Sequence, residues 1–433
     1  MVAAKTVCLK RLGGCRGGEL GAGRFFANRK VTAGQIIASW SERTASACAG
    51  RHVLAIDDTS EVKFPTTAQR RRGLGPVKKG KAHGLLVHAM IAVDAGSGGC
   101  LGLVGGEIWT RSGVNPVPHC KRPLEDRESM RWLRAAAQAK QVLEPAAMVT
   151  VLDDRESDIY AKWATVPAAT CHMLTRCMTD RRLAGGGMLF AAMAQFPVAG
   201  RRKIELPAHE PGKRKRSAVV QLRYGEVTIS RPDSEMDRTL PEAVCLRCVE
   251  VREIDPPADV EPLHWRLLTT HGIANEAAAW EIVDWYRQRW VIEQLFRVLK
   301  SQGLQLEDSQ LATAARLEKL AAAAVKAACI DIQLTQERDG HHQFPASVVF
   351  TEEETATVEA LVPTLEGNTE RQKNPHPAAG LARASWVIAR LGGWNCYYKP
   401  PGPITFRRGM ERFHAIHQGR LLEMRMKRDV RLP

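Results

Sequence analysis

Residues 282–303 read IVDWYRQRWVIEQLFRVLKSQG, and the rest of the chain is interpreted around this stretch. Its polar residues Tyr286, Arg289, Glu293 and Lys300 follow one another at steps of three, four and seven positions. At roughly 100° per residue, these steps put all four side chains on one face of a single α-helix. The apolar residues fall mostly on another side, so the sequence predicts a packed helix with one polar face.

This polar face surrounds one carboxylate with cations and a phenol, an arrangement that suits a phosphate-rich ligand. The simpler alternative is a solvated charged face with incidental pairs four residues apart. For such a stretch taken alone, the simpler alternative is the commoner case. The rest of the chain therefore has to decide between the two.

The composition favours a folded protein with a polyanionic partner. A chain of 433 residues exceeds one small core, so we expect two or three domains. Its 44% hydrophobic and 25% charged residues are ordinary values, but its net charge of +15 is not. Nucleic acid is the commonest partner of such a basic protein, and self-repulsion that aids solubility is the alternative.

The sequence lacks the marks of a membrane or secreted protein. No window has the apolar length that spans a bilayer, and the start, MVAAKTVCLKRLGGCRGG, has no apolar core of a secretory signal. Eleven cysteines are scattered without framework spacing, which is typical of a reducing cytoplasm. Cys245 and Cys248 form one CxxC among β-prone residues, so we expect strand residues there rather than zinc ligands.

Two apolar, β-prone runs each end in a pair of acids, at 52–62 and at 147–163, where the run continues into a helix. Between them the sequence predicts a β-hairpin around 94–99 and a helix within 125–143, and after them a short strand at 169–176. This order predicts a mixed α/β sheet, with hairpin-connected antiparallel strands followed by a crossover to a parallel neighbour.

The sequence divides into three parts. Residues 1–46 form a small N-terminal helical region, in which Thr32 caps a helix. Residues 47–342 form the core, with a β-rich insertion at about 178–275 and a long Ala-rich helix at 312–334. Residues 343–433 form a C-terminal helical region. A basic stretch with Arg70–Arg72, Lys78, Lys79 and Lys81 is a candidate phosphate-contacting loop, and the insertion carries the basic clusters Arg201–Lys203 and Lys213–Arg216.

Carboxylates at two strand ends could meet a third from the helix. Asp58 is expected to end the first strand and Asp154 the fourth, so their side chains would meet if those strands are neighbours. Glu293, on a helix packed across the sheet, could complete a triad. Because side chains alternate along a strand, only one member of each doublet can face the site, and Asp57 and Asp153 remain rivals.

Three such carboxylates would stay ionised only around cations. Oxygen-only ligation suits Mg²⁺ or Mn²⁺ rather than zinc. Two such ions can activate a water or a 3′-hydroxyl and stabilise the leaving oxygen of an in-line displacement. The residues thus indicate metal-dependent phosphodiester chemistry on a basic protein.

Three blocks in a fixed order resemble the conserved blocks of bacterial cut-and-paste DDE transposases, most closely the insertion-sequence-four family with its Tyr-Arg-Glu-Lys signature. They are DDTSEV, LDDRESDIYAK and Tyr286-x2-Arg289-x3-Glu293-x6-Lys300. Similarity continues in GKRKRSAVVQLRYGEVTI, PLHWRLLTT and SWVIARLGGW, and it covers most of the chain from about Arg24 onward.

The resemblance implies an RNase H-like catalytic core that cleaves DNA at transposon ends and performs strand transfer. It selects the acid before Thr59, which is Asp58, and the acid before Arg155, which is Asp154. With Glu293 these residues would be the catalytic metal ligands of a site for two Mg²⁺, or Mn²⁺, ions.

The resemblance also implies DNA contacts. Tyr286 and Arg289 would hold the transposon-end strand, including a base flipped out when a DNA hairpin forms, and Lys300 would contact backbone phosphate. Trp265 stands where the family has an aromatic that stacks on the flipped base, and every base offers a π-face for this. Arg176 matches a basic residue near the cleaved strand.

The start departs from the family, because only about twenty glycine-rich residues precede Arg24 where relatives have a fuller helical DNA-recognition domain. One hypothesis is an active transposase, a homodimer on double-stranded DNA in the nucleoid region of a bacterial cytoplasm. A structure-selective nuclease on the same core is a second. A third is an N-terminally shortened, inactive or inhibitory protein that binds DNA or dimerises.

Overall fold

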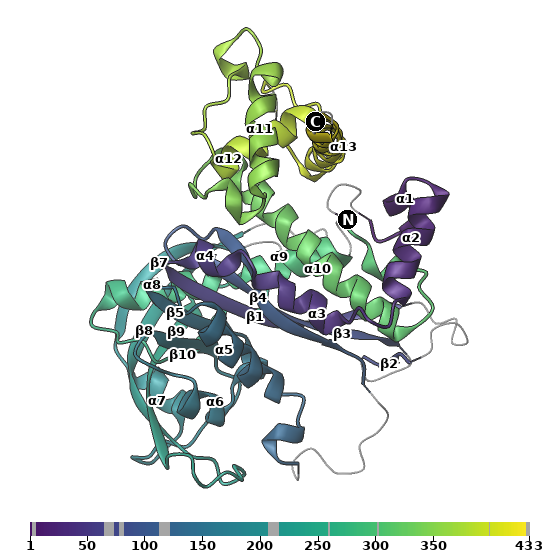
Figure 1. The fold of residues 1–433 in the computed structure, drawn as a ribbon. Helices are drawn as coiled ribbons and strands as arrows, with labels where there is room; N and C mark the ends of the chain where they lie inside the picture. Colours follow the sequence, from purple (N-terminus) through teal and green to yellow (C-terminus); the bar gives the residue numbers. More distant parts are fainter. Residues whose placement is uncertain are drawn as a thin grey trace.

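The computed structural model describes residues 1, 6–64, 73–77, 82–111, 122–206, 216–258, 260–300, 303–397 and 399–429. Within these residues ten strands form one mixed sheet, in the order β2-β3-β1-β5-β6-β10-β9-β8-β7, with β4 paired to β3. Helices cover both faces of this sheet (Figure 1). The chain is therefore mixed α/β, as the sequence predicts.

The first half of the sheet follows the predicted order of elements. Its strands are β1 (His52–Phe64), β2 (Gly75–Pro76), β3 (His83–Asp94), β4 (Cys100–Trp109), β5 (Met148–Asp153) and β6 (Cys171–Arg176). β3 and β4 form the predicted hairpin, whose turn is closed by Asp94 Oδ1 accepting from Ser97 N at 2.8 Å. β1 is antiparallel to β3 and parallel to β5, which is in turn parallel to β6.

β1 is longer than the sequence predicts, because it continues through Asp58 to Phe64. The whole segment after Asp58 pairs with β3, from Thr59 opposite His88 to Phe64 opposite His83. Asp58 therefore lies in the middle of a strand, and the expectation that it ends one is wrong. Asp154, by contrast, directly follows the last residue of β5.

The β-rich residues extend the core sheet instead of interrupting it. They form β7 (Val198–Leu206), β8 (Arg216–Ser230), β9 (Ala243–Glu253) and β10 (His264–Thr269), preceded by α7 (Leu189–Gln195). β10 pairs antiparallel with β6 and with β9, which joins the two halves. Cys245 and Cys248 both lie on β9, as the sequence predicts.

Residues 282–300 span two helices, α8 (Glu276–Arg287) and α9 (Trp290–Lys300), so the prediction of one helix is wrong. The turn between them tightens: Val291 N donates to Gln288 O at 2.9 Å, and Ile292 N donates to Arg289 O at 3.2 Å. Hydrogen bonds between residues three apart, as in a 3₁₀ helix, wind the chain more tightly than the bonds of an α-helix. Tyr286 and Glu293 therefore sit on different helices.

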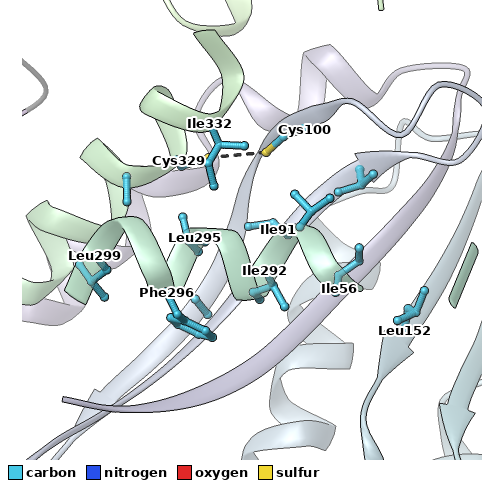
Figure 2. Close-up of a cluster of buried hydrophobic side chains, with 14 of the residues drawn as sticks. Ile56, Ile91, Cys100, Leu152, Ile292, Leu295, Phe296, Leu299, Cys329 and Ile332 are labelled. Atoms are coloured by element: carbon cyan, nitrogen blue, oxygen red, sulfur yellow. Dashed lines mark hydrogen bonds between the residues drawn. The ribbon is translucent and has the colours of Figure 1, made fainter. Parts of the chain in front are cut away.

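Strand alternation sorts the core into two layers. Leu54 and Ile56 of β1 pack with α9 and with α10 (Ala314–Gln336), the predicted Ala-rich helix. Figure 2 shows Ile292, Leu295 and Phe296 of α9 between the sheet and α10. The opposite face, with Val53, Ala55 and Val151, packs against α5 (Met130–Val142) and α6 (Tyr160–Thr165).

The N-terminal region is helical, including the glycine-rich segment for which no helix is predicted. Its helices are α1 (Leu9–Gly13), α2 (Arg16–Ala27), α3 (Ala33–Ala38) and α4 (Thr44–Cys48). Thr32 caps α3 in a capping box with Gln35, as expected. Phe26 of α2 is buried, and its carbonyl accepts from Lys319 Nζ of α10 at 3.2 Å. Packing on α10 thus stabilises a helix with poor intrinsic propensity.

The C-terminal region is also helical, with α11 (Glu352–Leu365), α12 (Leu381–Leu391) and α13 (Pro403–Asp429), which gather beyond one end of α10 (Figure 1). The 3₁₀ helices are η1 (Ser39–Ser41), η3 (Leu124–Asp126), η4 (Arg155–Ser157), η5 (Leu306–Asp308), η6 (Glu337–Asp339), η7 (Ala346–Val348) and η8 (Glu370–Gln372). No helix in the described ranges has the length and apolar character needed to cross a membrane.

Part of the basic surface falls outside this description. Arg70–Arg72, Lys78, Lys79, Lys81 and Lys213–Lys215 lie outside the described residues. Arg201–Lys203 lies on β7, and Arg216 begins β8.

Candidate active site

Asp58 projects from β1 toward the break between α8 and α9. Its Oδ2 accepts from Arg289 Nη1 at 3.1 Å, and its Oδ1 accepts from Thr59 N at 2.7 Å. Burial raises the pKa of the Asp58 carboxyl to about 6; Arg289 acts against the rise, and Asp154 adds to it. A carboxylate that is costly to ionise needs a nearby cation.

Glu293 reaches the same cation from the first turn of α9. Arg289, which stands in the break between the two helices, bonds to Glu293 with one guanidinium nitrogen and to Asp58 with another. The two carboxylates, 235 positions apart in the sequence (293 minus 58), therefore converge on one guanidinium. The predicted meeting of strand and helix acids is present for this pair.

Asp154 stands beside them at the carboxyl end of β5. It caps η4, with its Oδ1 accepting from Glu156 N at 2.8 Å. The negative charge of Asp154 acts to raise the pKa of both Asp58 and Tyr286, so the Asp154 carboxylate lies within electrostatic range of both groups. The carboxyl end of a strand beside a neighbouring parallel strand is the usual place for ligand-binding side chains in such sheets.

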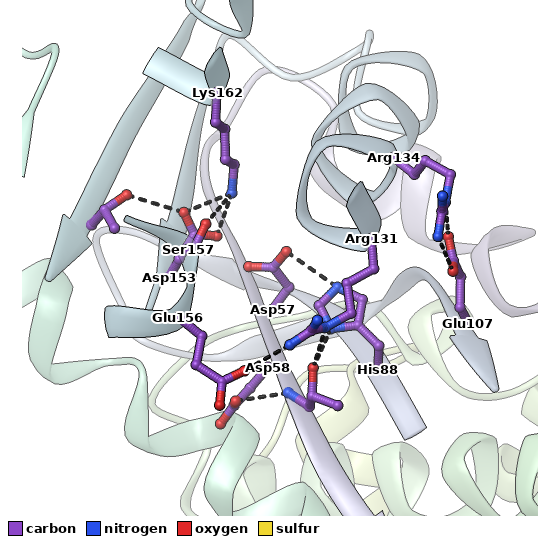
Figure 3. A network of polar contacts seen from close by, with 12 residues as sticks. Asp57, Asp58, His88, Glu107, Arg131, Arg134, Asp153, Glu156, Ser157 and Lys162 are labelled. Atoms are coloured by element: carbon purple, nitrogen blue, oxygen red, sulfur yellow. Dashed lines mark hydrogen bonds and ion pairs between the residues drawn. The ribbon is translucent and has the colours of Figure 1, made fainter. Parts of the chain in front are cut away.

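The rival acids face the other layer. Asp153 is fully buried and bonds to Lys162 Nζ at 2.7 and 2.8 Å, while Ser157 Oγ accepts from the same ammonium at 2.9 Å. Asp57 is equally buried, with His88 Nε2 3.5 Å from its Oδ2. Burial raises the pKa of both carboxyls. Figure 3 shows Asp57, Asp153, Ser157 and Lys162 in one cluster, with Asp58 outside it.

This buried cluster was not foreseen from the sequence. Lys162 is fully buried, and its ammonium lies 5.6 Å from the centre of the Trp132 ring. Arg131 of α5 connects β1 with η4, because it donates to Thr59 Oγ1 at 2.9 Å and to Glu156 Oε2 at 2.7 Å (Figure 3). The sequence feature that could have indicated this cluster is Lys162, which lies among apolar residues of a short helix that follows an acidic strand end.

Two aromatic side chains border the carboxylates. Tyr286 is nearly buried, and its ring meets that of Trp265 edge to face, with 5.3 Å between centroids. Burial raises the pKa of Tyr286, whereas Arg289 and Arg176 lower it. Arg176, the last residue of β6, also donates to His264 O at 3.1 Å. Arg176, Trp265, Tyr286 and Arg289 thus form one wall.

Lys300 lies at the other end of α9. Burial lowers the pKa of its ammonium, while the carboxylates of Glu307, Glu61 and Asp58 raise it. Lys300 therefore lies beside the far half of β1, in the electrostatic range of Asp58. The residues selected from the sequence come from β1, β6, β10, α9, the residue after β5, the end of α8 and the break between α8 and α9.

The donor set has the chemistry that Mg²⁺ or Mn²⁺ prefers, because all three acids offer oxygen. Among the described residues, no group of three or more His, Cys, Asp or Glu side chains is arranged to hold a metal ion. The guanidinium of Arg289 takes the cationic position between Asp58 and Glu293. The three acids thus fit a divalent cation in the type of their donor atoms, and Arg289 stands between two of them.

Comparison with known protein families gives a match to part of the chain. Residues 208–330 match the family described as the transposase DDE domain. This range contains Trp265, Tyr286, Arg289, Glu293 and Lys300, whereas Asp58, Asp154 and Arg176 precede it. The match supports a DDE transposase, in agreement with the resemblance of the sequence blocks.

Among solved structures, the chain is similar to a piggyBac transposase synaptic complex with hairpin DNA. The identity is 9% and the TM-score 0.29, over 65% of this chain and 48% of that one. The chain thus spans less than half the length of that transposase.

Proposed function

We propose that the protein is a DNA transposase of the insertion-sequence-four type, with an RNase H-like core that cleaves transposon ends and transfers the freed strand. The observation that carries the proposal is the convergence of Asp58 and Glu293 on one cation, with Asp154 beside them. The transposase DDE domain match over 208–330 supports the same class.

Asp58, Asp154 and Glu293 would hold the catalytic ions, two Mg²⁺ or Mn²⁺. Bound ions of this kind activate the attacking water or 3′-hydroxyl and stabilise the leaving oxygen. The chain's own contribution is to present three carboxylates from a strand, a strand end and a helix, whose packing keeps them in place. Because Asp58 is buried, its ionised carboxylate is unfavourable unless a cation lies next to it.

Arg289 would exchange partners when DNA binds. In the free protein its guanidinium neutralises Asp58 and Glu293. A DNA phosphate offers the same bidentate geometry as a carboxylate. Transfer of Arg289 to phosphate would free both acids for metal at the point where the strand arrives.

Tyr286, Trp265, Arg176 and Lys300 would hold the strand. The wall formed by Arg176, Trp265, Tyr286 and Arg289 offers an aromatic face and two cations next to the acids. Trp265 is half-buried and could stack on an unpaired base if Tyr286 shifts. Lys300 would take a backbone phosphate farther along α9.

The proposed active form is a homodimer on double-stranded DNA, since one active site per transposon end requires two protomers. The region 343–433 would carry the dimer contact, and residues 1–46 would contribute to DNA binding. Because its substrate would be DNA, we expect the protein to act in the nucleoid region of a bacterial cytoplasm.

The test is cleavage of a supercoiled plasmid bearing the element's own terminal repeats, with Mg²⁺ present. The proposal expects excised fragments with hairpin or 3′-hydroxyl ends, which disappear in Asp154→Asn. Asp233→Asn removes an exposed carboxylate, 93% accessible, and serves as the matched control that should cleave normally.

The other outcomes identify the alternatives. Cleavage that is indifferent to the repeats would indicate a structure-selective nuclease. Binding to the repeats without cleavage would indicate a shortened, inactive or inhibitory transposase derivative. Cleavage that survives in Asp154→Asn would contradict the proposed catalytic carboxylates.

A further inference from the structure

A pocket opens on the far side of Arg176 from Tyr286. Its volume is about 160 Å³, and its lining is Arg155, Arg176, Cys177, Met178, Phe190, His264 and Arg266. Along β10, side chains alternate, so His264 and Arg266 face one side of the sheet and Trp265 faces the other. The pocket therefore shares only Arg176 with the wall of the candidate active site.

The pocket lining contains more cationic side chains than neighbouring carboxylates can neutralise. Arg155, Arg176 and Arg266 bring three guanidinium groups, and His264 adds an imidazole. Two buried carboxylates lie beside them. Glu250 Oε1 is 2.8 Å from His264 Nε2 and 3.5 Å from Arg266 Nε, whereas Asp158 accepts from Met178 N at 2.8 Å and is paired with Arg181, outside the lining. Glu250 is shared further, because its Oε2 is 3.9 Å from the guanidinium of Arg223. The guanidinium groups that line the pocket therefore outnumber the carboxylates paired with them.

Arg266 is held in place yet keeps hydrogen-bonding capacity. Its guanidinium carbon lies 4.0 Å from the centre of the Phe190 ring, a stacked contact that fixes its plane. Its Nε is buried and has no hydrogen-bond partner among the described residues. The nearest acceptor to Nε is Glu250 Oε1 at 3.5 Å, so the donors of Arg266 that remain for a ligand are its other guanidinium nitrogens, which make no hydrogen bond with a described residue.

Arg155 completes the rim. It is exposed, and its side chain makes no ion pair or hydrogen bond with any described residue. Its position is fixed by its neighbour, because it directly follows Asp154 and begins η4. The pocket thus lies one residue from a proposed catalytic carboxylate at one side and touches the tyrosine wall, through Arg176, at another.

We propose that this pocket binds a phosphate group of the DNA strand, adjacent to the phosphate that is cut. Arg266 and Arg155 would donate to its oxygens, since paired guanidinium donors match phosphate geometry. A cavity of roughly 150 Å³ can hold a benzene ring, so the volume accommodates a phosphate group. The proposal rests on the proposed function for the identity of the polymer, and it adds a second anchoring point on the far side of the sheet edge.

The test measures binding without catalysis. A labelled duplex carrying the terminal repeat is titrated with the full-length protein in EDTA, at several salt concentrations, and followed by fluorescence anisotropy. Arg266→Gln and Arg155→Gln should each weaken binding and lower the magnitude of the salt slope by about 0.9, the value for one phosphate contact on duplex DNA. Arg182→Gln is the matched control, since it removes an exposed charge, 78% accessible, outside the pocket lining.

Because Arg155 is exposed, its variant keeps the test valid even if Arg266→Gln fails to fold. An unchanged salt slope in Arg155→Gln, or a slope that falls equally in Arg182→Gln, would overturn the proposal. Failure of the proposed function is a separate result, because it appears as absent or unspecific cleavage with Mg²⁺, whereas this assay contains no metal.

A second arm separates DNA phosphate from small anions. Inorganic phosphate is titrated against wild type and Arg266→Gln and observed by ³¹P line broadening. Line broadening that depends on Arg266, together with the lowered salt slope, supports a pocket that reads phosphate within DNA. Such broadening with an unchanged salt slope for duplex would make it a site for free phosphate and contradict the proposal.

Discussion

At the residue scale, the candidate site is a balance between three acids and one arginine. Asp58 and Glu293 are both partly buried, with 19% and 28% of the side chain exposed, and both depend on Arg289 for their counter-charge. Such a partly enclosed group is stable in the free protein and still open to exchange. Arg289 thus links DNA binding to the state of the acids.

The first prediction concerns this link. Arg289→Met leaves Asp58 and Glu293 without their cation, so in EDTA the unfolding free energy should fall by about 1–3 kcal/mol, less than for a fully buried pair. Added Mn²⁺ should then raise the melting temperature of the variant more than that of wild type, because no guanidinium has to leave first. Differential scanning calorimetry with and without Mn²⁺ measures both effects.

Arg287→Met provides the control, since Arg287 lies on the same chain segment but pairs with Asp284, away from the acids. Equal responses of the two variants to Mn²⁺ would show that Arg289 does not compete with metal.

The second prediction concerns the buried acids behind the site. Lys162→Met removes the ammonium that bonds to Asp153 and leaves two carboxyl groups buried without a cation. The loss should be about 3–5 kcal/mol in urea unfolding, the usual cost of breaking a buried pair from one side. The double variant Lys162→Met with Asp153→Asn should recover part of this loss, because the unpaired carboxyl is gone. Equal losses in the single and double variants would argue against a charge effect.

The doublets show what the sequence could and could not provide at this scale. Strand alternation predicts that one member of each doublet faces the site, and the structure places Asp57 and Asp153 in the buried cluster. Which member goes inside depends on Lys162 and His88, and no spacing rule connects these residues to the acids. The roles of Asp58 and Asp154 themselves stay a prediction.

At the element scale, the break between α8 and α9 is the feature that sequence pattern could not foresee. Gln288 and Arg289 are good helix formers, so local propensity favours one continuous helix. The break coincides with the contact of Arg289 to Asp58 on β1, a partner 231 residues away. Tertiary contacts of this kind override propensity, whereas the capped helix after Thr32 needs only neighbours and was predicted.

A cluster of histidines joins the strands to α8 and yields the third prediction. His271 stacks on His172 at 4.0 Å between centroids and lies 4.9 Å from the ring of Trp285. Thr150 Oγ1 lies 2.7 Å from His271 Nε2 and 2.8 Å from His52 Nε2. Burial, followed by the neighbouring imidazoles, lowers the pKa of His271 to about 3, and burial lowers that of His52.

The sign follows from proton binding. Below the ordinary value of 6.5, unfolded chains bind protons at these histidines while the fold keeps them neutral, until the pH approaches about 3 for His271. Their contribution to stability is therefore present above pH 6.5 and declines as the pH falls below it. His271→Gln should reduce the slope of unfolding free energy against pH between about 6.5 and 5 by up to roughly 1.4 kcal/mol per pH unit. Parallel curves for variant and wild type in urea titrations would contradict this assignment.

At the scale of the whole molecule, the sheet is the part that the sequence predicts least completely. The hairpin, the acidic strand ends and the β-rich character of 178–275 follow from local runs and turns. The join between β6 and β10 does not, because it pairs residues about ninety positions apart, such as Arg176 with Leu267. That join brings Trp265 to Tyr286 and places Arg266 beside Arg155.

The last prediction concerns the proposed homodimer. α13 displays apolar side chains to solvent, with Leu422 59%, Met424 57% and Met426 61% exposed. Leu422 and Met426 are four residues apart and share one face of α13, and exposed apolar residues on one face of a helix indicate a protein contact. Leu422→Lys should therefore lower the fraction of dimer on DNA carrying two terminal repeats and the yield of double-end cleavage, while binding to a single repeat stays within about twofold. Glu423→Lys introduces a lysine at the neighbouring exposed position and should leave the dimer intact. Light scattering coupled to size exclusion, with and without DNA, measures the mass; a dimer that survives Leu422→Lys would place the contact away from this face of α13.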